Sequence, residues 1–199
     1  MEEIVITCAC CGNTASYPLQ KESIRCRYCR QPVIPANHVD AKQVPPPARI
    51  KQIALLTQAE SQKPASSQIP MALGLFYLTG GAYQYAVPQF KKAIENDPMN
   101  ADAYFYLAVA MLGGKKAFLQ TLPNIKAIVE NLTFAEQLDP KAVYFYLHAY
   151  IAYDYYKRKF IGCSPSYTEL LAQARSMGLS QAEGDELFSL LKTEKPNNF

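Results

Sequence analysis

The chain has 199 residues, of which 49% are apolar, which suits one medium domain or a small module joined to a larger one. Its net charge is +3, and the excess lies in the first 52 residues, since the remainder holds equal numbers of basic and acidic side chains. An excess this small does not require a nucleic-acid partner.

The sequence shows no secretion signal and no membrane span. The start, Met1-Glu2-Glu3, lacks a basic region followed by an apolar stretch. The most apolar segments, 103–112 and 142–156, are too short or too polar to supply the roughly 20 apolar residues of a transmembrane helix. We therefore expect a cytoplasmic protein without a membrane partner. Thiols stay reduced there, so paired cysteines indicate a metal before disulfides.

Four of the six cysteines form two C-x2-C pairs near the start of the chain. Cys8 and Cys11 make the first pair, and Cys26 and Cys29 make the second after a spacer of fourteen residues. Two such turns can present four thiolates in a tetrahedral site, which suits zinc. The sequence predicts one structural Zn2+ ion held by these four residues. Because so short a segment cannot bury enough surface to fold alone, the metal would supply on the order of 10 kcal/mol.

Short extended segments surround the cysteines. Residues 14–19 and 23–27 are predicted to be strands joined by a turn at 20–22, with residues 3–7 as a third extended piece. This arrangement looks like a zinc ribbon over about residues 4–35.

Two residues complicate this cluster. Cys10 lies inside the first pair and could in principle replace Cys8 or Cys11 as a ligand, although the two-residue gap favours the latter two and leaves Cys10 a free thiol. Gly12 follows the first pair, where a tight turn often needs a positive φ. Arg30 holds the matching position after the second pair, so that turn is expected to be less ideal.

Residues 38–67 change in composition. The three prolines at 45–47 predict a stiff, polyproline-like break. An amphipathic helix is expected over 48–60, in a segment that acts as a hinge. The predicted organisation is therefore a zinc ribbon at 1–37, this proline-rich linker, and a helical domain at 68–195.

From about residue 68 a pattern recurs. Asp97-Pro98 precedes Tyr-Phe-Tyr-Leu at 104–107, and Asp139-Pro140 precedes the same four residues at 144–147. Apolar residues within each unit fall at helical spacing. The region resembles a tetratricopeptide repeat (TPR), a helix-turn-helix unit of about 34 residues.

The first unit matches the family signature at Leu73, Gly74, Tyr77, Ala86, Phe90 and Ala93. Gly74 and Ala86 are small, so the two helices can approach closely, and Tyr77 and Phe90 would fill the space between them. The second unit has a longer second helix, interrupted by Pro123, and the third is partial.

The last part of the chain completes the third unit. Its second helix is expected over 164–177, with Ser164 as its cap, and a capping helix over 181–192. The resemblance implies a mainly α fold: about 2.5–3 helix pairs plus a capping helix, TPR-like, beside a small N-terminal β zinc ribbon.

The resemblance also implies a groove, lined by the first helix of each pair, that binds a partner protein or peptide. The positions on that face are apolar or aromatic: Met71, Leu75, Leu78, Phe105, Val109 and Phe145. Relatives that grip an acidic peptide terminus carry Lys, Arg and Asn there, so a hydrophobic or helical peptide fits this chain better. The alternative that residues 50–56 fill the groove stays open.

No catalytic motif is present. The chain has only two histidines, His38 and His148, and lacks the G-x-S-x-G, H-E-x-x-H and phosphate-loop patterns. We therefore expect a non-enzymatic scaffold or adaptor. The alternative is a nucleic-acid-binding regulator whose ribbon uses Lys21, Arg25, Arg27 and Arg30, with the repeats recruiting a partner. A redox role for the cysteines is a third hypothesis. The sequence reveals neither the partner nor the oligomeric state.

Overall fold

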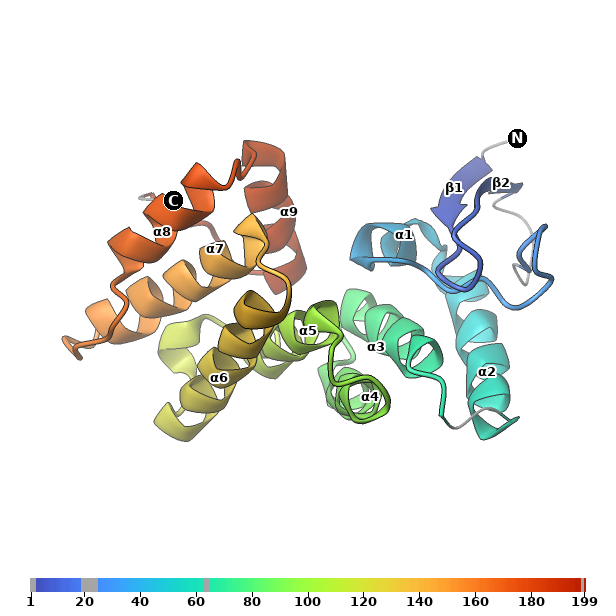
Figure 1. Ribbon diagram of the computed structural model, residues 1–199, viewed down its shortest axis with the longest axis horizontal. Helices are drawn as coiled ribbons and strands as arrows, with labels where there is room; N and C mark the ends of the chain where they lie inside the picture. Colours follow the sequence, from blue (N-terminus) through green and yellow to red (C-terminus); the bar gives the residue numbers. More distant parts are fainter. Residues whose placement is uncertain (1–2, 19–24, 63–64, 198) are drawn as a thin grey trace. The chain divides into compact units, whose positions relative to one another are not determined.

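The computed structural model describes residues 3–18, 25–62, 65–197 and 199 (Figure 1). The chain forms two compact units, Met1–Pro98 and Met99–Phe199. Among the described residues, no helix combines the length and the apolar character that crossing a membrane requires.

The first unit begins with a β-hairpin. Strand β1 (Glu3–Thr7) pairs antiparallel with β2 (Thr14–Pro18), from Glu3 opposite Pro18 to Thr7 opposite Thr14. The sequence predicted that residues 14–19 would pair with 23–27. In the structure β2 pairs with β1 instead, because the first cysteine turn reverses the chain and brings the two strands together. Arg25 makes only an isolated bridge to Pro32. The expected turn at 20–22 lies outside the described residues, as do residue 19 of the first expected strand and residues 23 and 24 of the second.

Two helices follow the hairpin. Helix α1 (His38–Gln43) starts at the Asn37 cap, whose side chain accepts a hydrogen bond from the Asp40 N–H. Helix α2 (Pro46–Gln62) begins inside the proline triplet rather than after it. Proline is tolerated in a first helical turn because the missing N–H would have no intrahelical partner.

Helices α1 and α2 are tied to their surroundings in the first unit. Both pack on α3 (Gln68–Gly80), and α1 also contacts β1. Gln52 of α2 is buried and donates a hydrogen bond to the Val33 carbonyl at 2.9 Å. This segment is therefore packed helix along most of its length in the structure.

The first helix pair consists of α3 and α4 (Tyr83–Asn96). Phe90 of α4 is fully buried, and its ring lies directly against Gly74 of α3. A Cβ atom added at Gly74 would come within 2.6 Å of that ring. The close approach that the sequence predicted for this pair is present.

The second unit holds two more pairs and a last helix. Its helices are α5 (Ala101–Leu112), α6 (Leu122–Leu138), α7 (Ala142–Ile151), α8 (Tyr167–Ser176) and α9 (Gln181–Leu191). Helix α5 pairs with α6 and α7 pairs with α8, while α9 packs on α7 and α5 (Figure 1). Two short helical turns complete the unit, the 3-10 turn η1 (Ala117–Leu119) and the π-helical turn η2 (Ala152–Lys157).

Two boundaries in this unit differ from expectation. The extra length of the second repeat lies in the connection through η1, and Pro123 stands in the first turn of α6, where it is tolerated. Helix α8 is capped by Ser166 rather than Ser164, because Ser166 forms a reciprocal capping box with Glu169.

Candidate metal centre

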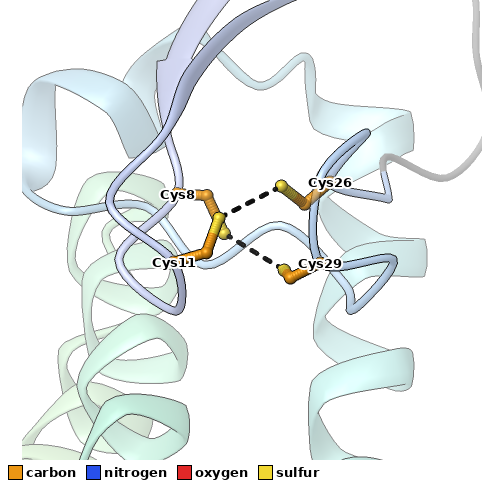
Figure 2. Close-up of side chains that lie close together, drawn as sticks. All are labelled: Cys8, Cys11, Cys26 and Cys29. Carbon is orange, nitrogen blue, oxygen red and sulfur yellow. Dashed lines mark hydrogen bonds between the residues drawn. The ribbon is translucent and has the colours of Figure 1, made fainter.

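The first cysteine pair sits in the turn that joins β1 to β2. The Gly12 N–H donates to the Cys8 carbonyl at 2.7 Å, and the Cys8 N–H donates to the Asn13 carbonyl at 3.0 Å. Gly12 has a φ of 72°, in the left-handed region that glycine enters without steric cost. This tight turn directs the Cys8 and Cys11 side chains to one side of the backbone (Figure 2).

The second pair repeats this geometry. The Arg30 N–H donates to the Cys26 carbonyl at 2.9 Å, and the Cys26 N–H donates to the Gln31 carbonyl at 2.9 Å. Arg30 has a φ of 60°, so a residue with a Cβ occupies the left-handed position that Gly12 fills in the first turn. That conformation costs about 1–2 kcal/mol for a non-glycine residue.

Arg30→Gly is therefore expected to stabilise the turn. Relief of the left-handed strain outweighs the greater freedom of glycine in the unfolded chain, and we expect a gain of about 1 kcal/mol in the free energy of unfolding. Urea unfolding of the metal-loaded protein measures it. Arg27→Gly is the control, since Arg27 is exposed and has no positive φ, and it should not stabilise the protein. If Arg30→Gly were less stable than the wild type, the left-handed conformation of Arg30 could not be a source of strain.

The two turns bring four sulfur atoms together. The Sγ atoms of Cys11 and Cys26 are 3.6 Å apart, and those of Cys8 and Cys29 are 4.0 Å apart (Figure 2). All four lie within 4.8 Å of one another. These distances are far beyond the roughly 2.05 Å of a disulfide bond. The four residues that the spacing singled out therefore form one cluster with the geometry of a metal site.

The electrostatics of the cluster favour a bound cation. Burial acts to raise the pKa of Cys26, but the backbone N–H groups of Cys29 and Tyr28, with the Cys11 thiol and the Tyr17 hydroxyl, hold it at about 6. Burial, followed by the nearby Cys26 and Cys11 thiols, raises the pKa of Cys29 to about 12. Four crowded thiols therefore resist ionising together unless a cation offsets their mutual repulsion.

Tyr17 is a neighbour of the cluster that sequence reasoning did not assign to it. It lies on β2, its side chain is buried, and burial followed by the neighbouring Cys26 raises its pKa to about 12. Its hydroxyl is buried beside the Cys26 thiol. The alternation of β2 could have indicated an inward-facing Tyr17, but not that it faces a cysteine.

The other two cysteines lie outside the cluster. Cys10 is exposed, although it stands between Cys8 and Cys11 in the sequence. Cys163 is half-buried, and burial raises the pKa of its thiol. The structure thus brings together the two C-x2-C pairs and leaves Cys10 facing solvent.

The basic side chains near the cluster are exposed. Arg25, Arg27 and Arg30 face solvent, and the Arg27 guanidinium lies 5.8 Å from the centre of the Tyr17 ring. Lys21, which the sequence grouped with them, lies outside the described residues.

The six positions predicted to contact a partner are all buried. Met71, Leu75 and Leu78 lie on α3, on which α1 and α2 pack, while Phe105 stacks on Tyr144 at 4.8 Å between ring centres. Val109 of α5 and Phe145 of α7 lie on the two helices that α9 contacts. In the segment 50–56, the alternative occupant of the groove, Leu56 is buried but Ile50 faces solvent.

Comparison with known proteins shows the fold but no family. No known protein family and no curated protein sequence matches the chain. Among solved structures, MamA AMB-1 is 21% identical, with a TM-score of 0.51 over 69% of this chain and 72% of that chain. MamA MSR-1 is 23% identical, with a TM-score of 0.46 over 71% and 68% of the two chains. The chain is thus mainly α, a TPR-like helical repeat with a small two-stranded N-terminal sheet.

Proposed function

We propose that this protein is a non-enzymatic scaffold or adaptor, in which a structural metal holds the N-terminal hairpin and TPR-like helices bind a partner protein or peptide. The observation that carries the proposal is the succession of helix pairs, α3 with α4, α5 with α6 and α7 with α8, ended by α9. Repeated helix pairs of this kind are suited to binding other proteins. Reduced, metal-binding thiols are in keeping with a cytoplasmic location.

The metal in this proposal is a single Zn2+ ion. A tetrahedral zinc with Zn–S bonds of about 2.3 Å separates its sulfur ligands by about 3.8 Å. The two measured sulfur pairs, Cys11 with Cys26 at 3.6 Å and Cys8 with Cys29 at 4.0 Å, lie on either side of that value. Thiolates select zinc over the hard cations, which prefer oxygen. Four protein ligands leave no open position for substrate, so the proposed role is structural.

The proposed partner-binding residues lie on the first helices of the pairs: Met71, Leu75 and Leu78 in the first unit, and Phe105, Val109 and Phe145 in the second. Because these side chains are buried, a partner would reach them only when the elements packed on their helices move aside: α1 and α2 from α3, and α9 from α5 and α7. The proposed partner is a hydrophobic or helical peptide, since the face carries no charge.

Affinity capture with paired variants tests the site. The double variant Phe105→Leu/Phe145→Leu alters the face while keeping side-chain bulk, and we expect about tenfold weaker recovery of the partner. Phe134→Leu is the matched control, because Phe134 is exposed on α6, the second helix of its pair. Thermal unfolding confirms that each variant is folded. Equal recovery by all three proteins would place the binding site elsewhere.

A nucleic-acid-binding regulator is the second candidate. It is favoured by the exposed Arg25, Arg27 and Arg30 beside the cysteine turns. Phosphate-driven binding is strongest at low salt and falls steeply as salt is added. A mobility-shift titration at low salt therefore decides it, and no shift under those conditions ends this alternative.

A further inference from the structure

The π-helical turn η2 ends in a cap that normally requires glycine. The Phe160 N–H donates to the Lys157 carbonyl at 3.1 Å, and the Ile161 N–H donates to the Tyr156 carbonyl at 2.9 Å. This is the hydrogen-bond pattern of a Schellman motif, in which the residue in the left-handed conformation is usually glycine. Here that residue is Phe160, with a φ of 56°.

The Phe160 side chain is not part of the hydrophobic core. Phe160 is 98% exposed, the highest value among the large apolar side chains that the structure describes. A large aromatic residue in a left-handed conformation is unfavourable for the backbone, and an uncovered ring gains no burial. Neither backbone geometry nor packing therefore explains why a phenylalanine occupies this position, and a role in binding would.

Phe160 stands at a tip that two segments build together. Turns η1 and η2 pack on each other, and the Phe118 ring lies 4.5 Å from the Arg158 guanidinium carbon and 5.0 Å from Lys159 Nζ. We define the basic tip as residues 115–119 and 157–161. Two further apolar side chains are exposed on it, Leu119 at 68% and Ile161 at 41%.

The tip carries a concentrated positive charge. Its cationic side chains are Lys115, Lys116, Lys157, Arg158 and Lys159. Buried Asp154 pairs with Arg158 at 2.5 Å, and Glu194 pairs with Lys116 at 3.3 Å. In the described part of the chain, the other three lysines of the tip form no ion pair with an acid. Lys157 and Lys159 lie instead over the rings of Tyr167 and Tyr155.

In contrast to the sequence-based expectation of no membrane partner, we propose that the basic tip binds the surface of an anionic lipid bilayer, with the Phe160 ring entering the boundary between headgroups and acyl chains. Cations near such a surface are attracted to its negative charge, and aromatic rings settle at its interface. A bilayer accepts a projecting ring without a preformed pocket, whereas a protein partner must supply one. The Phe160 ring is almost fully exposed, and Lys115, Lys116 and Lys157 beside it face solvent, so a soft, negatively charged surface complements both.

Vesicle co-sedimentation of the full, metal-loaded chain tests this proposal. We expect binding to vesicles of phosphatidylcholine with phosphatidylserine, little binding to phosphatidylcholine alone, and weakening with added salt. Phe160→Gly should bind about tenfold more weakly. Since glycine suits the left-handed cap, its unfolding temperature should be no lower than that of the wild type. Weaker vesicle binding by Phe160→Gly can therefore not be attributed to loss of folding.

Charge variants test whether the lysines of the basic tip contribute to vesicle binding. Lys115→Gln and Lys157→Gln, both at exposed positions, should each weaken vesicle binding about fivefold, the equivalent of roughly 1 kcal/mol per cation near the surface. Arg175→Gln is the control. Helix α8 begins beside the tip at Tyr167, whereas Arg175 is exposed in its last turn, at the opposite end of the helix. It should bind like the wild type.

Phe160→Trp provides a direct readout of insertion. The chain contains no tryptophan, so this variant has a single indole fluorophore. Its emission should shift to the blue on addition of phosphatidylserine vesicles and stay unshifted with phosphatidylcholine alone. The proposal is overturned if the wild type fails to bind anionic vesicles at low salt, if Phe160→Gly binds as well as the wild type, or if the indole emission of Phe160→Trp does not move.

Discussion

Replacement of Cys26 by serine is expected to abolish metal binding and to unfold the cysteine-rich segment, while the second unit stays folded. The two strands β1 and β2 make a single hairpin, which is marginally stable by itself in water. A structural zinc contributes on the order of 10 kcal/mol to such a segment. Its loss exceeds what the hairpin and its contacts with α1 can replace, so we expect local unfolding rather than a small shift in stability.

Metal analysis and hydrogen exchange measure this effect. The wild type should hold one zinc ion per chain and protect the amides of β1 and β2, whereas Cys26→Ser should lose both. Cys10→Ser is the matched control, because Cys10 is exposed and lies outside the cluster. A Cys26→Ser protein that keeps its metal and its amide protection would contradict the proposed site.

The same site implies a dependence on pH. Burial and the neighbouring thiols raise the pKa of Cys29 to about 12, so a bound zinc would displace a proton from this thiol at neutral pH. Metal binding that releases protons strengthens as pH rises and weakens as pH falls. The stability that zinc supplies is therefore expected to be present at neutral and alkaline pH and lost on acidification, which zinc release measured against pH would show.

Gly74→Ala is expected to lower the free energy of unfolding by about 2 kcal/mol. Elsewhere in a helix this change is favourable by roughly 1 kcal/mol, because alanine is the better helix former. At Gly74 the new methyl carbon would lie 2.6 Å from the Phe90 ring, which is fully buried. Helices α3 and α4 would have to separate or Phe90 would have to leave its rotamer.

Gly80→Ala is the control for this experiment. Gly80 is the last residue of the same helix, is exposed, and an added Cβ would meet only the end of the Arg49 side chain at 3.7 Å. We expect it to be neutral or slightly stabilising in urea unfolding. If Gly74→Ala proved as stable as Gly80→Ala, the two helices would have to be less closely packed than the structure has them.

Features encoded by short spacings were predictable from the sequence. The interval within each C-x2-C pair dictates that its two thiols share one side of a turn, and the four cysteines do cluster. Gly74 with Phe90 likewise predicted the close approach of α3 and α4. The capping helix was recognisable from Ser180, which caps α9 through a reciprocal pair with Glu183. Each of these features is determined by residues that are close in sequence or lie within one repeat unit.

Contacts between distant segments were decided only by the tertiary structure. The pairing of β1 with β2 depends on where the first cysteine turn sends the chain, and the burial of Leu75 and Leu78 depends on the packing of their helix with the elements around it. The exposure of Phe160 likewise could not be deduced from its neighbours in the sequence. Sequence spacing by itself therefore determined the cysteine cluster and the helix pairs. The three-dimensional packing determined which of their surfaces remain open, because burial sums many weak contacts between residues far apart in the chain.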